Sequence, residues 1–201
     1  METIFKPGYE RILRIFYENP SKNFYLREIA RKTKINENGT SRFLKDLEKK
    51  GILKSKLDGN LKRYYLTENQ QVNLIFSSFD IERINKLPSL RSKALYYFIE
   101  KLSEKPVFAV LFGSTANGNF TKESDIDILL IVNNKIDVKD AEKYVNAQTG
   151  MRINTFIIPY NNFLKELKLK EDMVIQSAIN TGYPIINHIY YHEVINGSRR
   201  D

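Results

Sequence analysis

The sequence of 201 residues contains no cysteine and no tryptophan, and its only histidines are His188 and His192. Without cysteine there can be no disulfide, no thiolate nucleophile and no thiolate metal ligand. With only two histidines, a histidine-based zinc site is not expected either. Any metal bound by this chain is therefore expected to be held by oxygen ligands, as magnesium is.

Long apolar runs are also missing, because none approaches the ~20 residues that a membrane-spanning helix needs. The first residues, METIFKPGYERIL, lack the basic and then apolar pattern of a secretory leader. A hydrophobic fraction of 42%, with 12 Phe and 12 Tyr, is enough for packed cores. We therefore expect a folded cytoplasmic protein with no membrane partner.

The net charge of +8 is unevenly distributed along the chain. Residues 1–70 carry 16 Lys and Arg against 9 Asp and Glu, a balance of +7, whereas residues 71–201 carry 16 against 15, a balance of +1. A basic first third and a near-neutral remainder indicate a polyanion-binding module attached to a second unit. A solvated basic surface with no partner is the alternative that charge alone leaves open.

The first third predicts three helices followed by a hairpin. A helix starts after Pro7, a short one contains Leu26, Ile29 and Ala30, and a longer one runs from about Thr40 to Lys50. Gly51 is expected to end the third helix. The turn Asp58-Gly59-Asn60 between two alternating runs is typical of a hairpin.

This order resembles the winged helix-turn-helix domains of bacterial and archaeal transcription regulators, over roughly residues 7–68. The resemblance implies that the third helix enters the major groove of double-stranded DNA while the hairpin meets backbone phosphates. The candidate DNA-binding residues are Asn38, Thr40, Ser41, Arg42 and Lys45 around that helix, with Asn36 leading into it, and Lys54, Lys56, Lys62 and Arg63 on the hairpin. A protein-interaction or dimerisation module is the alternative.

Residues 71–105 predict a helical connector in two pieces, separated at Pro88. The second piece carries an apolar stripe that includes Leu90, Leu95 and Phe98. Such a stripe indicates either core packing or the seam of a homodimer.

The chemistry-bearing residues lie between two predicted strands of a second domain, residues 106–190. The run Val107–Phe112 reads as a strand buried on both faces and ends at Gly113-Ser114, and a second strand starts at Asp125-Ile126-Asp127. Alternate side chains of a strand share a face, so the two carboxylates should project together. Paired carboxylates favour a divalent cation, and a glycine lets a backbone approach a phosphate closely. An ordinary turn beside a solvated strand edge is the alternative.

The spacing G-S-x10-D-x-D between two such strands resembles the nucleotidyltransferase superfamily typified by DNA polymerase beta, and above all the minimal prokaryotic nucleotidyltransferases. The resemblance implies that Gly113 and Ser114 bind a nucleoside triphosphate, ATP or another, and that Asp125 and Asp127 bind Mg²⁺ or Mn²⁺. Some of these proteins act as antitoxins, which makes a toxin-like protein a candidate partner.

The third member of the family's acidic set is missing. A third strand is expected at Arg152–Ile158, and there Asn154 stands where the resemblance implies a carboxylate. An amide can coordinate magnesium weakly, but it cannot act as a base. We therefore count Asp125, Asp127 and Asn154 as the candidate catalytic set, and we expect transfer to be weakened or abolished while nucleotide binding stays possible.

These observations predict a mixed α+β or α/β chain, with an N-terminal winged helix at 1–70 and a small mixed-sheet nucleotidyltransferase fold with flanking helices. The leading hypothesis is an enzyme that transfers AMP from ATP to a hydroxyl of a macromolecule. The rival is a non-catalytic DNA-binding regulator whose second domain senses a nucleotide or docks a partner.

Overall fold

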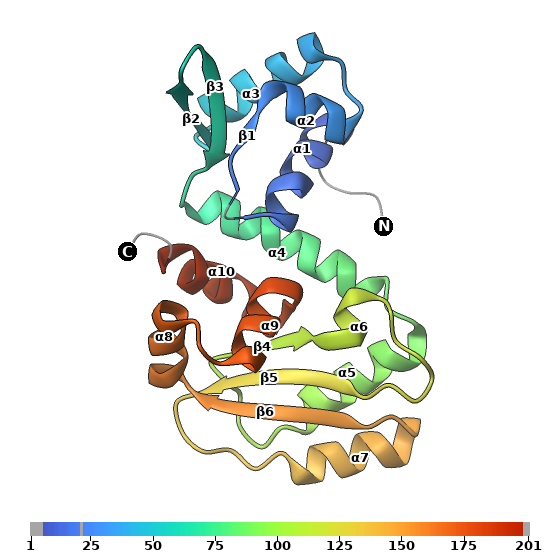
Figure 1. Cartoon of the computed structure of the whole chain (residues 1–201). Coiled ribbons are helices and arrows are strands. Elements are labelled where there is room, and N and C mark those ends of the chain that lie inside the picture. The colour runs from blue at the N-terminus through green and yellow to red at the C-terminus, as the bar shows by residue number, and fades with distance from the viewer. Residues whose placement is uncertain (1–5, 21, 199–201) are drawn as a thin grey trace. The chain divides into compact units, whose positions relative to one another are not determined.

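The computed structural model describes residues 6–20 and 22–198, and the chain divides into two compact units, residues 1–79 and 80–201 (Figure 1). The division falls within helix α4 (Gln70–Asn85), inside the stretch expected as a connector. Both units combine helices with strands, which confirms the predicted mixed class. Within the described part of the chain, no helix is both long enough and apolar enough to cross a membrane.

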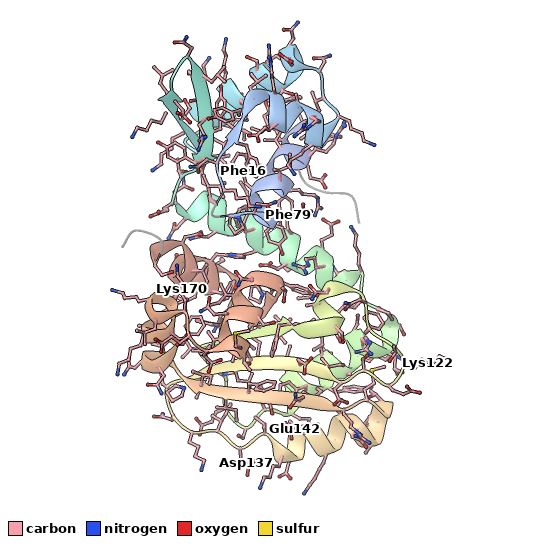
Figure 2. All side chains as sticks on the ribbon, viewed as in Figure 1. Phe16, Phe79, Lys122, Asp137, Glu142 and Lys170 are labelled. Carbon is pink, nitrogen blue, oxygen red and sulfur yellow. The ribbon has the colours of Figure 1, made fainter. Side chains whose placement is uncertain are left out.

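The first unit is built from helices that pack against a small antiparallel sheet. Its helices are α1 (Pro7–Glu18), α2 (Leu26–Thr33), α3 (Glu37–Lys49) and the start of α4, and its strands are β1 (Phe24–Tyr25), β2 (Leu53–Asp58) and β3 (Leu61–Leu66). The sheet has the order β1-β3-β2. Phe16 and Phe79 both belong to the buried cluster of this unit (Figure 2).

Local chemistry explains where these helices start and end. Pro7 is the first residue of α1, where its missing N–H costs no hydrogen bond. Helix α3 begins at Glu37, three residues before the predicted start at Thr40, because the Asn36 side chain caps it by accepting a hydrogen bond from the Gly39 N–H at 2.7 Å. Gly51 follows this helix with φ +67°, as predicted.

The predicted hairpin is present, and its turn has two residues. Asp58 pairs with Leu61, which leaves Gly59 and Asn60 as the turn, and Gly59 has a φ of +60° that suits this turn. Strand β1 was not predicted; it is two residues long and pairs Phe24 with Tyr64 of β3.

The second unit is a four-stranded mixed sheet covered by helices. Its helices are the end of α4, α5 (Ser89–Lys101), α6 (Gly113–Asn117), α7 (Lys139–Thr149), α8 (Tyr160–Leu169), α9 (Met173–Thr181) and α10 (His188–Gly197). Its strands are β4 (Phe108–Phe112), β5 (Ile126–Val132), β6 (Ile153–Pro159) and β7 (Tyr183–Ile186), in the order β6-β5-β4-β7. β5 and β6 are parallel, and the other neighbouring pairs are antiparallel.

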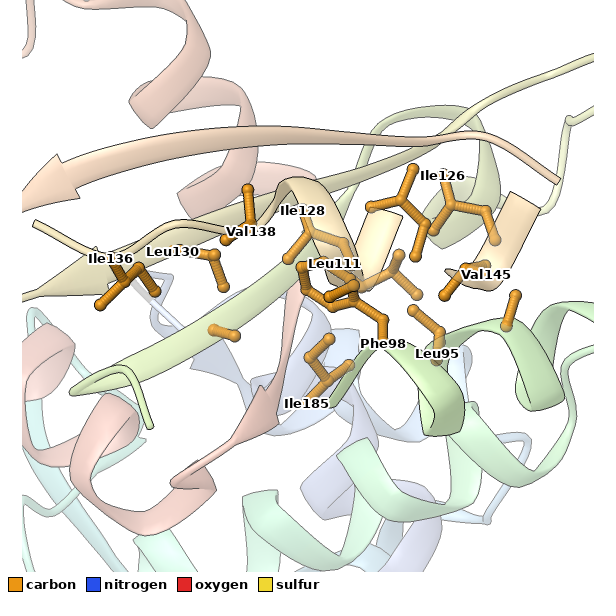
Figure 3. Close-up of a cluster of buried hydrophobic side chains, with 14 of the residues drawn as sticks. Leu95, Phe98, Leu111, Ile126, Ile128, Leu130, Ile136, Val138, Val145 and Ile185 are labelled. Atoms are coloured by element: carbon orange, nitrogen blue, oxygen red, sulfur yellow. The ribbon is translucent and has the colours of Figure 1, made fainter. Parts of the chain in front are cut away.

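Strand β5 is buried on both faces, as its unbroken apolar run predicted. Ile126, Ile128 and Leu130 belong to a cluster with residues of α5 and α7 (Figure 3), whereas Leu129 and Ile131 belong to a second cluster with residues of α8, α9 and α10. Every second side chain of β5 therefore points to the same helical layer.

The apolar stripe of α5 packs inside its own unit. Leu95 and Phe98 are buried in the cluster that also contains Ile128, while Leu90 is 45% exposed. Of the two expectations for this stripe, core packing is confirmed. Leu95 and Phe98 are consequently not available as a homodimer seam.

Candidate functional site

The residues predicted to bind a nucleotide and a metal come together at one end of the sheet of the second unit. Phe112, the last residue of β4, pairs with Asp127 near the start of β5. Asp127 in turn pairs with Asn154 near the start of the parallel strand β6. The end of β4 and the starts of β5 and β6 therefore meet, although Phe112 and Asn154 are far apart in sequence.

Gly113 lies against the carboxylate of Asp127, and a side chain at this position would force that carboxylate to move. Its φ is +68°, in the left-handed region that favours glycine. A Cβ atom placed on Gly113 would lie 2.3 Å from Oδ2 of Asp127, far inside any ordinary contact. The backbone conformation favours glycine, and a side chain here would push the Asp127 carboxylate aside, so the Gly-Ser end and the Asp-Ile-Asp end of this stretch form one site.

The two aspartates differ in their surroundings. Asp127 is half-buried, and its Oδ1 accepts a hydrogen bond of 3.1 Å from the Asn154 side-chain amide. Asp125 directly precedes β5 and is exposed, and within the described residues its carboxylate has no partner. Because residues two apart in an extended chain share a face, Asp125 projects on the same side as Asp127.

Ser114 follows Gly113 as the second residue of α6 and is half-buried. Its Oγ has no hydrogen-bond partner among the described residues. An unengaged hydroxyl that directly follows Gly113 can donate to a phosphate oxygen, because a hydroxyl is both a donor and an acceptor.

Among the described residues, no other acid replaces the missing carboxylate. In residues 6–20 and 22–198, no three His, Cys, Asp or Glu side chains come together as a metal site. Asp172 caps α9 by accepting hydrogen bonds from Val174 N and Ile175 N at 2.8 and 3.0 Å. Asp137 accepts one from Lys139 N at 2.9 Å, and Figure 2 shows it beside the start of α7. The donor set of the site is thus two carboxylates and one amide.

This donor set fits one magnesium ion. Magnesium is commonly held by one or two carboxylates together with substrate phosphates, and it accepts amide oxygens. Asn154 would have to turn its oxygen toward the ion, which would break its present hydrogen bond to Asp127. A second ion would lack the third carboxylate that could neutralise it.

Sequence reasoning missed Arg91, a buried residue that contacts the loop between α6 and β5. The sequence could have indicated that Arg91 is buried, because Arg91 lies on the same helical face as Leu95 and Phe98, at spacings of four and seven residues. An arginine on an otherwise apolar face must find acceptors when it is buried.

The predicted DNA-binding residues of α3 divide into exposed and buried ones. Asn38, Arg42 and Lys45 are exposed and Ser41 is half-buried. Thr40 is fully buried, with its hydroxyl 3.4 Å from the Ile35 carbonyl oxygen, so it is less exposed than the other candidates on α3. The physical reason is that Thr40 lies on the same face of α3 as the buried Leu44 and Leu47, at spacings of four and seven residues.

The candidate DNA-binding cations of the hairpin also differ in their exposure and in their partners. Lys54 and Lys56 of β2 and Lys62 of β3 are exposed. Arg63 forms a 2.8 Å ion pair with Asp58 and also donates to the Tyr25 hydroxyl, and this hydrogen bond raises its pKa. Much of the charge of Arg63 is therefore already compensated within the unit, which the sequence did not indicate.

Comparison with known proteins supports the assignment of the second unit. Residues 93–189 match the model of the family described as Polymerase beta, Nucleotidyltransferase. These residues include Gly113, Ser114, Asp125, Asp127 and Asn154. The chain therefore contains a nucleotidyltransferase-family domain.

Two further comparisons add little. No curated protein matches the chain. Among solved structures the chain is similar to TrmBL2, described as an archaeal chromatin protein that shows a novel mode of DNA binding, with 18% identity over 81% of this chain and 75% of that one. The TM-score of 0.25 is too low to support an inference about this chain.

Proposed function

We propose that the nucleotidyltransferase-family domain in residues 93–189 binds a nucleoside triphosphate, ATP in the first instance, together with one Mg²⁺. The observation that carries this proposal is the contact between Gly113 and Asp127, where a Cβ atom would lie 2.3 Å from the carboxylate. It supports a site in which a bare backbone, a serine hydroxyl and two carboxylates face the same ligand.

Asp125 and Asp127 would hold the metal, with Asn154 as a weaker third ligand. The ion supplies positive charge that neutralises the phosphates and favours departure of pyrophosphate. The backbone at Gly113 can approach a phosphate closely because it carries no side chain. The hydroxyl of Ser114 can donate a hydrogen bond to a phosphate oxygen.

The reaction we propose is transfer of AMP to a hydroxyl of a macromolecule. The acceptor oxygen forms a bond to the α-phosphorus while the bond from that phosphorus to the bridging oxygen breaks, and pyrophosphate leaves with the electron pair. Asn154 cannot take the proton of the hydroxyl, since an amide is not a base, so this proton passes to solvent water. We therefore propose slow transfer, with a partner protein such as a toxin-like protein as the acceptor.

A second candidate is nucleotide sensing without transfer. The hydrogen bond from the Asn154 amide to the Asp127 carboxylate favours sensing without transfer. Asn154 stands where the family has a third carboxylate, and its amide holds Asp127 in place without adding a negative charge. In this case the domain binds ATP and Mg²⁺ but releases the nucleotide unchanged.

We also propose that the first unit is a winged helix that binds double-stranded DNA. Exposed Arg42 and Lys45 on α3 and exposed Lys54, Lys56 and Lys62 on the hairpin support this. Cations in these places can neutralise backbone phosphates, which gives an affinity that falls steeply with salt. Binding of a labelled duplex, followed by fluorescence anisotropy at low and at moderate salt, tests it. An absence of binding at low salt would contradict the proposal.

Calorimetric titration of ATP into the full chain tests the nucleotide site. We expect saturable binding that requires Mg²⁺ and that is lost in Asp127→Asn, which keeps the size of the side chain but removes its charge. Glu171→Gln is the matched control, because this exposed acid lies outside the site. Equal binding by all three proteins, or binding that does not depend on Mg²⁺, would contradict the proposal.

A further inference from the structure

Arg91 lies in the second unit on α5 and is only 1% exposed. Among the described residues it has no carboxylate partner. Burial lowers the pKa of its guanidinium, since desolvation disfavours the charged form. A buried cation without an acid is costly unless several acceptors surround it.

The acceptors of Arg91 all lie in the stretch that joins the Gly-Ser turn to the aspartates. Its guanidinium donates to Thr115 Oγ1 at 2.6 Å, to the Thr121 carbonyl at 2.9 Å and to the Ser124 carbonyl at 3.0 Å. It also stacks over the ring of Phe120, with its central carbon 4.1 Å from the ring centroid. One side chain thus holds several points of a segment that has no regular structure after α6.

These bonds lead directly to the aspartate backbone. Ser124, whose carbonyl accepts from Arg91, is the neighbour of Asp125. The Thr115 hydroxyl accepts from Arg91 and lies 3.4 Å from the Asp125 carbonyl oxygen, to which it donates. Thr115 is itself 1% exposed, so water does not compete for either bond.

The other end of α6 is held by a second arginine. Arg83 of α4, also in the second unit, donates to the Ala116 carbonyl at 3.0 Å and lies over the ring of Tyr183 at 3.9 Å. Arg83 and Arg91 thus both donate hydrogen bonds to α6, the short helix that starts at Gly113. Neither was among the residues expected from the sequence.

We infer that Arg91, acting through Thr115 and the Ser124 carbonyl, is a positioning residue that sets the place of Asp125 relative to Gly113 and Asp127. The inference rests on the proposed function, since it concerns the same nucleotide and metal site. Arg91 touches neither ligand. Its planar group reaches three acceptors at once, which the single ammonium of a lysine cannot reproduce.

A purely structural role for Arg91 would give a different outcome. In that case loss of its bonds would lower the melting temperature, but the folded protein would bind metal and nucleotide as before. If Arg91 positions Asp125, the folded variants bind metal more weakly, because partners of metal ligands commonly change metal affinity by about 10- to 100-fold.

The experiment uses the full chain and two substitutions at Thr115, with Mn²⁺ as the probe. Thr115→Val keeps the shape but loses both hydrogen bonds, whereas Thr115→Ser keeps the hydroxyl. Arg91→Lys keeps the charge but loses the planar group, and Lys93→Gln changes an exposed charge on the same helix. Free Mn²⁺ is measured by electron paramagnetic resonance at low temperature, with and without a non-hydrolysable ATP analogue, and circular dichroism establishes that each variant is folded.

We expect Thr115→Ser and Lys93→Gln to bind Mn²⁺ with the nucleotide analogue as the wild type does. Thr115→Val and Arg91→Lys should bind about tenfold more weakly or worse. Wild-type affinity in folded Thr115→Val overturns the inference and leaves the proposed function standing. If Arg91→Lys does not fold, the difference in Mn²⁺ affinity between Thr115→Val and Thr115→Ser tests the inference. A wild type that binds neither Mn²⁺ nor the analogue overturns the proposed function and this inference with it.

Discussion

The side-chain amide nitrogen of Asn154 lies 3.1 Å from Oδ1 of Asp127. The two residues are direct partners in the parallel pair of β5 and β6. An ionised carboxylate accepts hydrogen bonds and cannot donate them, so the amide completes a stable pair without metal. A second carboxylate at position 154 would instead face Asp127 as a like charge.

The first prediction concerns Asn154→Asp. Without metal this change should lower the free energy of unfolding by about 1–3 kcal/mol, because it replaces a hydrogen bond by repulsion between carboxylates. With Mg²⁺ the loss should be recovered, and AMP transfer should rise. Thermal melting in EDTA and in Mg²⁺ measures the first effect. Asn154→Ala, which loses the bond but adds no charge, should not respond to Mg²⁺ more than wild type does. Equal melting of Asn154→Asp in both buffers would contradict the prediction.

Gly113→Ala separates the contact with Asp127 from backbone strain. Gly150 provides the control, because its φ of +69° is nearly the same as the +68° of Gly113, while a Cβ atom there would meet nothing within 4 Å. Both alanine variants should lose about 1–2 kcal/mol of stability from the left-handed backbone. Only Gly113→Ala should also lose ATP binding, measured by calorimetry, since its methyl group displaces the carboxylate. Retained binding in a folded Gly113→Ala variant would exclude a ligand at this position.

DNA affinity should depend on the exposed cations of α3 more than on Arg63. Arg42→Ala and Lys45→Ala should each weaken duplex binding at low salt and reduce the slope of log affinity against log salt by about 1. Arg63→Ala should change this slope less, because Arg63 is already paired with Asp58. Lys165→Ala, an exposed change on α8, is the control. Fluorescence anisotropy over a salt series gives the slopes, and unchanged slopes for Arg42→Ala and Lys45→Ala would argue for a protein-interaction role.

Stability should fall at alkaline pH through Tyr183. Burial raises the pKa of Tyr183 from 10.0 to about 12. Because the folded pKa lies above the unfolded one, the contribution is fully present below pH 10 and is lost as the pH rises from about 10 to 12. Its size is about 2–3 kcal/mol, from roughly 1.4 kcal/mol for each pKa unit. Denaturant unfolding at several pH values, compared with Tyr183→Phe, measures it. The same pH dependence in both proteins would show that Tyr183 is not its source.

Much of the fold could be predicted from the sequence, because hydrophobic periodicity and turn residues act locally. The turn at Gly59 and the buried strand β5 are examples. The start of α3 was misplaced because the cap is Asn36, and the apolar pattern does not mark a cap. Strand β1 was missed because two residues show no alternation, and its pairing with β3 is a tertiary contact.

Part of the candidate site was also predictable, because some of its geometry depends only on residues that are close in sequence. Asp125 and Asp127 are close in sequence, and strand geometry alone places them on one face. That Asn154 would pair with Asp127 depends on the register of a parallel strand, which only the folded sheet provides. The bonds of Arg91 to the Thr121 and Ser124 carbonyls involve the backbone of an irregular loop, so no residue pattern marks them.

We propose that the end of the sheet at Gly113, Asp127 and Asn154 binds ATP and metal and supports a slow transfer of AMP. Incubation of the full chain and co-purified partners with ATP labelled at the α-phosphate, in Mg²⁺ or Mn²⁺, tests it most directly. We expect label on a protein in the wild-type reaction, more label with Asn154→Asp, and none with Asp125→Ala or Asp127→Ala. Label that persists in both aspartate variants, or its absence from wild type and Asn154→Asp alike, would contradict transfer at this site.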